Sequence, residues 1–409
     1  MTHEEVLADL AGLVEFAAAG RVDGGFAWLD LEGRPDATGR PVELWITCRT
    51  THVAALAALV DLELPPGTDP VGLVDHGLAA LRGALHDDVH GGWYAGTGSA
   101  ASRDKEAYGH AFVVLAAASG TALGRPGARA LLDEALGVVE DRFWVEADGM
   151  AVDRWDETFT DLDPYRGVNA NMHLVEALLA AHDVTGDLVH LDRAVRITTT
   201  VVQRFGRPAA YRLPEHYDEA WRAQRDLNRD RPEDLFRPYG VTIGHLYEWA
   251  RLAVHVTRAA PDHPEVADLL DDARALVERA TTDGWGVDGR DGFVYTTDFD
   301  GVPVVRERLH WVAAEALGAA TVLDQATDDP RYAALHRTWS DWVEAYVVDR
   351  TGGSWWHELD ERNRPAYRMW PGKPDVYHAF QALLLPLLPP CASFVGGALA
   401  ARGQRREGR

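Results

Sequence analysis

Two segments of the chain carry imidazole and carboxylate groups on a pattern that is otherwise typical of a buried helix. Asn169, His173 and Glu176 recur at i, i+4 and i+7, so they share one helix face. His245 and Glu248 lie three residues apart on one face of a second helical segment. A polar stripe beside an apolar one indicates a helix that borders a cavity. A lone histidine on a helix is more often a hydrogen-bonded structural residue, so neither segment is decisive alone.

A third segment of this kind, residues 373–378, ends in His378 and leads into an apolar run that anchors it. Histidine titrates near cellular pH, so it suits the removal and return of a proton. Such groups could take the C2 proton of a sugar aldehyde, form an enediol and protonate C1, which gives a ketose. Returning the proton to the opposite face of C2 would give the 2-epimer instead. Arginine and further histidines can stabilise the enediolate oxygen without a metal.

The elements that must position these groups are mainly helices. Many segments repeat apolar residues at i, i+3, i+4 and i+7, as Met172, Val175 and Leu179 do, and several open with Ser, Thr, Asp or Pro. The expected helices span residues 43–60, 70–85, 105–119, 127–143, 169–185, 188–204, 242–258, 264–281, 310–324, 330–347 and 375–388.

Gly- and aromatic-rich turns of short β character separate these helices, about every 60 to 75 residues. They lie at residues 24–28, 91–94, 148–155, 283–285 and 352–356, with a weaker one at 206–211. A helical hairpin cannot cover its own apolar stripe, so neighbouring hairpins must stack. We expect an all-α (α/α)6 barrel, with six hairpins in a closed toroid and β-like loops at the pocket end. An open α-solenoid is the alternative.

Composition narrows the function. The formal charge of −24 disfavours binding to nucleic acid and to anionic membranes. Cys48 and Cys391 are far apart and indicate free thiols in a reducing compartment, and residues 1–19 do not look like a secretory signal, so we expect a cytoplasmic protein. We expect one catalytic domain over residues 1–391 and a polar, frayed tail over 392–409. A homo-oligomer stays an open alternative.

The segment 237–252 resembles the Gly-His-x-x-Glu-Trp signature of the N-acylglucosamine 2-epimerase superfamily. The sequence segments that flank it are most similar to the aldose–ketose isomerase branch, which includes mannose and sulfoquinovose isomerases. Further matching segments are residues 74–77, 90–94, 169–176, 214–216, 306–315 and 370–378. The resemblance extends from about Trp45 to about Pro386, nearly the whole chain.

This resemblance implies an (α/α)6 barrel in which His245 and His378 form the proton-transfer pair. His173 and Glu248 would polarise or orient the O1 and O2 region of the sugar. The resemblance gives the substrate-binding residues as Arg49, Trp45, Tyr108, Asn169, Arg237 and Trp311. It implies no metal and no cofactor, and a monosaccharide as the small-molecule partner.

The function that we expect is metal-independent isomerisation of D-mannose to D-fructose, or of lyxose to xylulose, through a cis-enediol. The alternatives are 2-epimerisation of glucose or mannose, cellobiose or an N-acylglucosamine, and then sulfoquinovose isomerisation. Helical barrels also host glycoside hydrolases and lyases, which need two carboxylates at the bond, whereas the polar segments here centre on histidine. A catalytically silent sugar- or protein-binding relative is the non-enzyme alternative.

Three features have competing interpretations. His86 and His90 have a spacing that suits a metal, but they precede a Gly-Gly turn and are more typical of a solvated loop. Trp45, Trp311 and Trp370 suit core packing and sugar stacking equally. The long polar segment 214–235 is either a surface loop or a lid that would exclude water from the enediolate.

Overall fold

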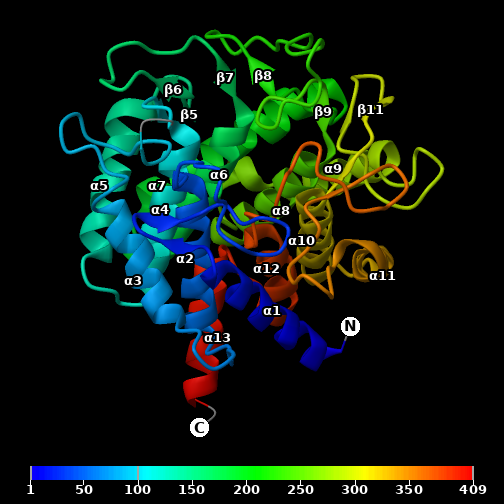
Figure 1. Ribbon diagram of the computed structural model, residues 1–409. Coiled ribbons are helices and arrows are strands. Elements are labelled where there is room, and N and C mark those ends of the chain that lie inside the picture. Colours follow the sequence, from blue (N-terminus) through cyan, green and yellow to red (C-terminus); the bar gives the residue numbers. More distant parts are fainter. Residues whose placement is uncertain (1, 99–100, 408–409) are drawn as a thin grey trace.

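The computed structural model describes residues 2–98 and 101–407, and this part of the chain contains thirteen α-helices and only short strands (Figure 1). None of the described helices combines the length and apolar character needed to cross a bilayer. The predicted predominance of helix is confirmed. Three of the expected outer helices end in a π-helical turn, at residues 139–143, 200–206 and 343–347.

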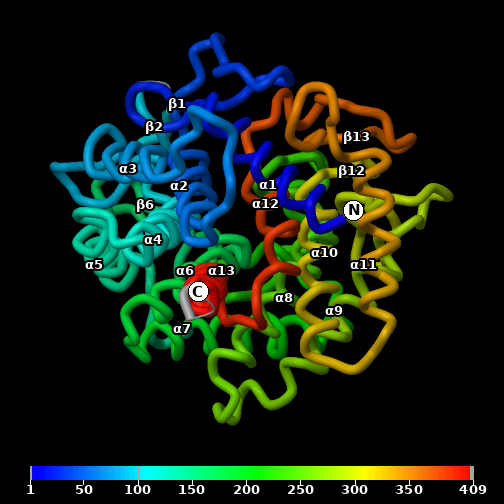
Figure 2. Tube along the Cα trace, turned by 90° about the horizontal axis from the view of Figure 1, so that it is seen from below, coloured from blue at the N-terminus to red at the C-terminus, as the bar shows by residue number. Residues whose placement is uncertain are grey.

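Six helices are buried on nearly all sides and form the inner layer. They are α2 (Leu44–Leu59), α4 (Ala107–Ala122), α6 (Val168–Thr185), α8 (Ile243–Ala259), α10 (His310–Ala326) and α12 (Tyr377–Leu384). Each contacts the next in sequence order, and α12 also contacts α2. In Figure 2 the six follow one another around the centre of the molecule. A helix that is apolar all round is expected inside a protein, and the Ala-rich inner helices fit this rule.

Six further helices cover the inner layer from outside. They are α1 (His3–Ala18), α3 (Pro70–Leu81), α5 (Ala128–Val138), α7 (Leu188–Thr199), α9 (Leu269–Gly284) and α11 (Pro330–Trp342). Each outer helix buries a single apolar stripe. In α5 the buried residues are Ala128, Leu131, Leu132, Ala135 and Leu136. Asp side chains cap α3, α7 and α11 by accepting a backbone N–H of the first turn.

The short strands lie at the end of the molecule where the inner helices begin (Figure 1). They form the pairs β1–β2 (Arg21–Val22, Gly25–Phe26), β3–β6 (Lys105–Glu106, Arg154–Trp155), β4–β5 (Trp144–Val145, Met150–Ala151), β7–β8 (Arg166–Gly167, His216–Tyr217) and β12–β13 (Arg308–Leu309, Glu358–Leu359), and the three-stranded sheet β9–β10–β11 (Val241–Thr242, Thr296–Thr297, Pro303–Val305). All pairs are antiparallel.

In five of the six inner helices, the loops that carry these strands take the place of a side-chain cap. The first backbone N–H of an inner helix donates to a carbonyl in the loop that follows the next outer helix. The bonds are Leu44 to Ala95 (2.9 Å), Ala107 to Asp153 (2.8 Å), Val168 to Glu215 (3.2 Å), Ile243 to Tyr295 (3.1 Å) and His310 to His357 (3.2 Å). Helix N-termini have backbone donors without intrahelical partners, and here the loops satisfy them. The loops are thereby held over one end of the inner layer.

The expectation of a frayed C-terminal tail is wrong. Residues Phe394–Glu407 form α13, which packs against α2, α4 and α6 at the end opposite the strands (Figure 1). Phe394, Val395, Ala398 and Ala401 are buried. Their spacing of i, i+1, i+4 and i+7 makes one apolar helix face, which the surrounding Gly and Arg residues obscure in the composition. The last two residues, 408 and 409, lie outside the described part.

Candidate active site

The predicted site residues come together at the strand-bearing end of the inner helices. Each of the six inner helices contributes at least one side chain to a cavity of about 50 Å³. Its lining residues are Trp45, Arg49, Tyr108, Asn169, His173, Leu235, Phe236, Pro238, His245, Glu248, Tyr295, His310, Trp311, Trp370, Asp375 and His378. Nine of the ten predicted residues are in this set, and Arg237 is not.

His378, on α12, is held by a carboxylate that has two donors. Its Nδ1 lies 3.0 Å from Oε1 of Glu315, and the other oxygen of Glu315 accepts from Nε of Arg251 at 2.8 Å. Both side chains are almost fully buried. Burial opposes ionisation of Glu315, but Arg251 and His378 outweigh it and lower the pKa of the carboxyl. An ionised carboxylate only accepts hydrogen bonds, so Nδ1 of His378 carries a proton and Nε2 is the ring nitrogen that could act as a base.

His245, on α8, has a similar neighbour. Its Nδ1 lies 2.9 Å from Oε1 of Glu215, although the alignment falls short of a hydrogen bond. Trp311 packs between the two histidines, with ring centroids 5.1 Å from His245 and 5.9 Å from His378. A side chain at Gly244 would place its Cβ 2.2 Å from the Trp311 ring. The glycine before His245 therefore lets Trp311 lie directly on α8 and brings both imidazoles to one wall.

His173 and Glu248 face each other deeper in the site, with Nδ1 and Oε1 3.6 Å apart. Burial lowers the pKa of His173 well below its usual value, and Arg49 adds to this effect. Burial and the Glu315 carboxylate raise the pKa of Glu248 well above its usual value. Burial therefore disfavours the charged form of each group.

Arg49, on α2, lies opposite these groups. Its guanidinium donates to Asp375 at 2.8 Å and to the Tyr108 hydroxyl at 3.0 Å. Burial opposes ionisation of Asp375, but Arg49 outweighs it and lowers the pKa of the carboxyl. Asp375 also lies 3.6 Å from Nε2 of His378. A fixed, buried cation therefore lies at the same end of the cavity as His378.

Several polar atoms around the cavity have no hydrogen-bond partner within residues 2–98 and 101–407. They are Arg49 Nε, Asn169 Oδ1, His173 Nδ1, His245 Nδ1 and Trp370 Nε1. Buried polar atoms are nearly always satisfied in native proteins. A set of unsatisfied donors and acceptors around one cavity fits a polar, hydroxyl-rich ligand.

Two groups of residues have spacing that could hold a metal. His173, Glu176 and Glu248 approach within 4.8 Å of one another, but Tyr377 and Gln381 donate to Glu176, and Arg251 donates to Glu248. Donors of this kind already satisfy the carboxylates as a hydrogen-bonded network.

The second group contains His90, with Asp87 and Glu157, and the ammonium of Lys105 lies 2.7 Å from Asp87. A resident cation there disfavours a metal ion. His86 instead contacts Asp88 and Glu134 at 2.7 and 2.8 Å.

Arg237 lines a second, outer cavity of about 300 Å³ instead of the inner one. Its guanidinium lies 3.7 Å from the centre of the Tyr165 ring and 4.0 Å from Asp163. The segment that carries it contains no helix or strand between β8 and β9. Leu235, Phe236 and Pro238 of this segment line the inner cavity, so the segment covers the site. Whether it moves stays a prediction.

The carboxylates that support the histidines were not predicted as site residues. Glu215, Glu315 and Asp375 lie within the motifs 214–216, 306–315 and 370–378, so a signal for them was present. The chain has 64 acidic residues, and a carboxylate has no signature that separates a histidine partner from a solvated surface group. Proximity decides this, and His378 and Glu315 are 63 positions apart.

Comparisons with known proteins agree with this geometry. The sequence model of the family described as N-acylglucosamine 2-epimerase (GlcNAc 2-epimerase) matches residues 24–382. A D-mannose isomerase of Thermobifida fusca is 52% identical over 97% of this chain and 96% of its own length. One from Pseudomonas cannabina pv. alisalensis is 44% identical over 95% and 93%. A crystal structure of a D-mannose isomerase, 27% identical, covers 94% of this chain and 98% of its own, with a TM-score of 0.85.

Proposed function

Because the chain belongs to the N-acylglucosamine 2-epimerase family, with the matched region spanning residues 24–382, we propose that it isomerises D-mannose to D-fructose. Similarity to two D-mannose isomerases over more than nine tenths of the chain supports this assignment. The single observation that carries the chemistry is the pair His245 and His378, which lie on either side of Trp311 in one cavity and each have a carboxylate at Nδ1.

The proposed reaction moves one proton between neighbouring carbons. Nε2 of His378 takes the proton from C2 of the open-chain aldose, and the electrons of the broken bond form the C1–C2 double bond of a cis-enediol. The same group returns a proton to C1 while the O2 proton leaves, which gives the ketose. His245 moves a proton between the oxygens O1 and O2. A base that reaches C1 and C2 on one face gives isomerisation, and this requires no redox partner.

The remaining groups would stabilise negative charge on the enediolate. Arg49 supplies a permanent buried cation, and Glu248 and His173 would orient the O1 and O2 region of the sugar. Fixed donors in a site that excludes water stabilise developing charge more strongly than water does. Trp45, Tyr108 and Asn169 line the same wall and would contact the sugar hydroxyls. We expect this chemistry to proceed without a metal ion or cofactor.

The same proposal includes the architecture and setting of the enzyme. We propose a single (α/α)6 barrel over residues 1–391, supported by contacts between successive inner helices and between α12 and α2. A cytoplasmic location is supported by two free, buried cysteines, Cys48 and Cys391. The partner is a monosaccharide, and a homo-oligomer is an open alternative that sedimentation would test.

One incubation tests the reaction. Purified protein with EDTA is given mannose, glucose, lyxose and cellobiose in deuterated water, and the products and label positions are determined by NMR. Fructose labelled at C1 is the expected product of mannose. An aldose labelled at C2 would favour 2-epimerisation, and loss of activity with EDTA would refute the metal-independent mechanism. His245→Ala and His378→Ala should each remove nearly all turnover; a catalytically silent binding protein would be unaffected.

A further inference from the structure

Two cavities meet at the active site and share part of their walls. The inner one contains the histidines, and the outer one lies beside it under the loops. Four residues line both cavities, namely Trp45, Tyr108, Asn169 and Phe236. These residues are therefore the partition between the catalytic groups and the outer cavity.

The inner cavity is too small for its proposed substrate. Ligand pockets in proteins usually have volumes of about 300–1,000 Å³, whereas this cavity has about 50 Å³. Part of the lining must therefore shift when a sugar binds. Trp45, Tyr108 and Asn169 belong to packed inner helices, and displacing them would disturb the core.

Phe236 is the member of the partition that lies outside the packed inner helices. It lies in the segment without helix or strand between β8 and β9, and its side chain is 49% exposed. The backbone around it is tied down: the Pro238 carbonyl accepts from Nε2 of His216 at 2.7 Å, and the Asn228 side chain donates to the Arg237 carbonyl at 2.6 Å. The Phe236 ring packs edge-to-face with Tyr108, with ring centroids 6.1 Å apart.

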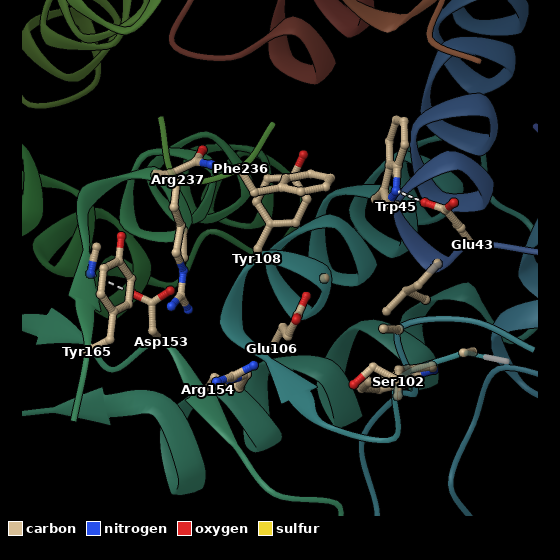
Figure 3. A pocket seen from close by; sticks show the side chains of 18 of the residues that line it. Glu43, Trp45, Ser102, Glu106, Tyr108, Asp153, Arg154, Tyr165, Phe236 and Arg237 are labelled. Carbon is tan, nitrogen blue, oxygen red and sulfur yellow. Dashed lines mark hydrogen bonds between the residues drawn. The ribbon is translucent and has the colours of Figure 1, made fainter. Parts of the chain in front are cut away.

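The outer cavity has the chemistry of a sugar-binding site. Figure 3 shows Phe236 against Tyr108 at its centre, with Trp45 on one side and Arg237 and Tyr165 on the other. Its remaining polar lining includes Glu43, Glu106, Asp153, Arg154 and Ser102. Aromatic faces stack on sugar rings, while carboxylates and guanidinium groups bind hydroxyls.

The protonation of this lining also suits a neutral ligand. Burial raises the pKa of Glu43 and of Glu106, and it raises the pKa of Asp153 to about 6. The carboxyls therefore carry less negative charge than three exposed acids would. Asn169 Oδ1, at the junction, is buried and has no partner among the described residues.

We propose that Phe236 is a specificity residue that restricts the enzyme to a single sugar ring by separating the catalytic cavity from an outer site able to hold a second ring. This inference rests on the proposed function, because it assumes that the inner cavity binds the reacting sugar. With the ring in place, a second sugar ring that extends from the inner into the outer cavity meets Phe236. Without it, the two cavities are continuous, and a disaccharide with mannose at its reducing end fits across them.

Phe236→Ala tests this with mannose and β-1,4-mannobiose as substrates. The matched control is Tyr367→Ala, which truncates an aromatic side chain that is 51% exposed and lines neither cavity. We expect the ratio of kcat/KM for mannobiose to kcat/KM for mannose to rise at least tenfold in Phe236→Ala and to stay within twofold in the control. Thermal unfolding curves of all variants confirm that each is folded.

A double variant tests the outer site itself. Adding Glu106→Ala to Phe236→Ala removes a polar group of the outer cavity without touching the inner one, and it should reduce the gained mannobiose activity at least threefold with mannose activity unchanged. An unchanged substrate ratio in folded Phe236→Ala overturns the proposal. If the unaltered protein does not isomerise mannose, the proposed function fails instead, so the two failures are distinguishable.

Discussion

Glu315 provides the sharpest test of the site, because it accepts from two donors at once. Its oxygens lie 3.0 Å from Nδ1 of His378 and 2.8 Å from Nε of Arg251. Glu315→Gln keeps the shape but offers one acceptor and one donor. If the amide oxygen faces the permanently charged Arg251, the amide N–H faces Nδ1 of His378. The imidazole must then carry its proton on Nε2, where the lone pair of the base should be.

The expected loss follows from this inverted tautomer. General base catalysis by a positioned side chain contributes about 10²- to 10⁴-fold, and inversion of a histidine tautomer by the equivalent change in serine proteases costs about 10⁴-fold. We therefore expect kcat for mannose to fall about 10²- to 10⁴-fold. KM should change less than about threefold, because Glu315 does not line the cavity. Initial rates of fructose formation give both constants.

Two further variants separate the tautomer from packing. Glu315→Asp keeps an acceptor-only carboxylate and should retain more activity than Glu315→Gln, although its side chain is shorter. Asp324→Asn removes an exposed charge from the same helix and serves as the control, with kcat unchanged. The reasoning would be refuted if folded Glu315→Gln had a kcat within tenfold of that of the unaltered protein, or a kcat higher than that of Glu315→Asp.

Three other predictions concern binding, stability and pH. Arg49→Lys should lower kcat/KM for mannose about ten- to hundredfold, since a lysine cannot bridge Asp375 and Tyr108 together; unchanged steady-state constants would contradict this. Phe394→Ala should lower the free energy of unfolding by about 3–5 kcal/mol in urea titrations, because it empties the contact of α13 with the inner helices; a loss under about 1 kcal/mol would show that this helix is dispensable. Burial raises the pKa of Asp153 to about 6, so its stabilising contribution is complete below about pH 4 and is lost as the pH rises through 6. Asp153→Asn should therefore gain up to about 3 kcal/mol relative to the unaltered protein between pH 4 and pH 7, and parallel pH–stability curves would contradict this.

The inner helices were predictable because their apolar periodicity is strong and local. Met172, Val175 and Leu179 mark α6 without any tertiary information, and all three are buried. The N-terminal helix α1 and the C-terminal helix α13 were not predicted. In α13 the apolar face of Phe394, Val395, Ala398 and Ala401 is diluted by glycine and arginine, so its composition favours a solvated tail. In α1 the acidic residues that argue against a secretory signal are also typical of a surface helix. Its buried stripe can be recognised only when the helices against which it packs are known.

The histidines of the site were predictable, but their partners were not. His245 and His378 stand out because imidazole is rare on an apolar helix. Glu215 approaches His245 from a neighbouring hairpin, and no local pattern encodes that approach. Arg237 shows the opposite case: its residue type suits sugar binding, yet backbone ties and the Tyr165 ring turn it into the outer cavity. Long-range geometry decides both outcomes.

Glu215 links two successive hairpins, and this limits how the loops can change. Its carbonyl accepts the first N–H of α6 from Val168, its carboxylate lies 2.9 Å from His245 on α8, and β8 begins at the next residue. Side chains alternate along a strand, so a single-residue insertion or deletion before β8 would turn this carboxylate away from the imidazole. Exchange of a loop between relatives should therefore succeed only when the whole segment is transferred and its spacing to these two-residue strands is kept. Point substitutions within the loop should be tolerated.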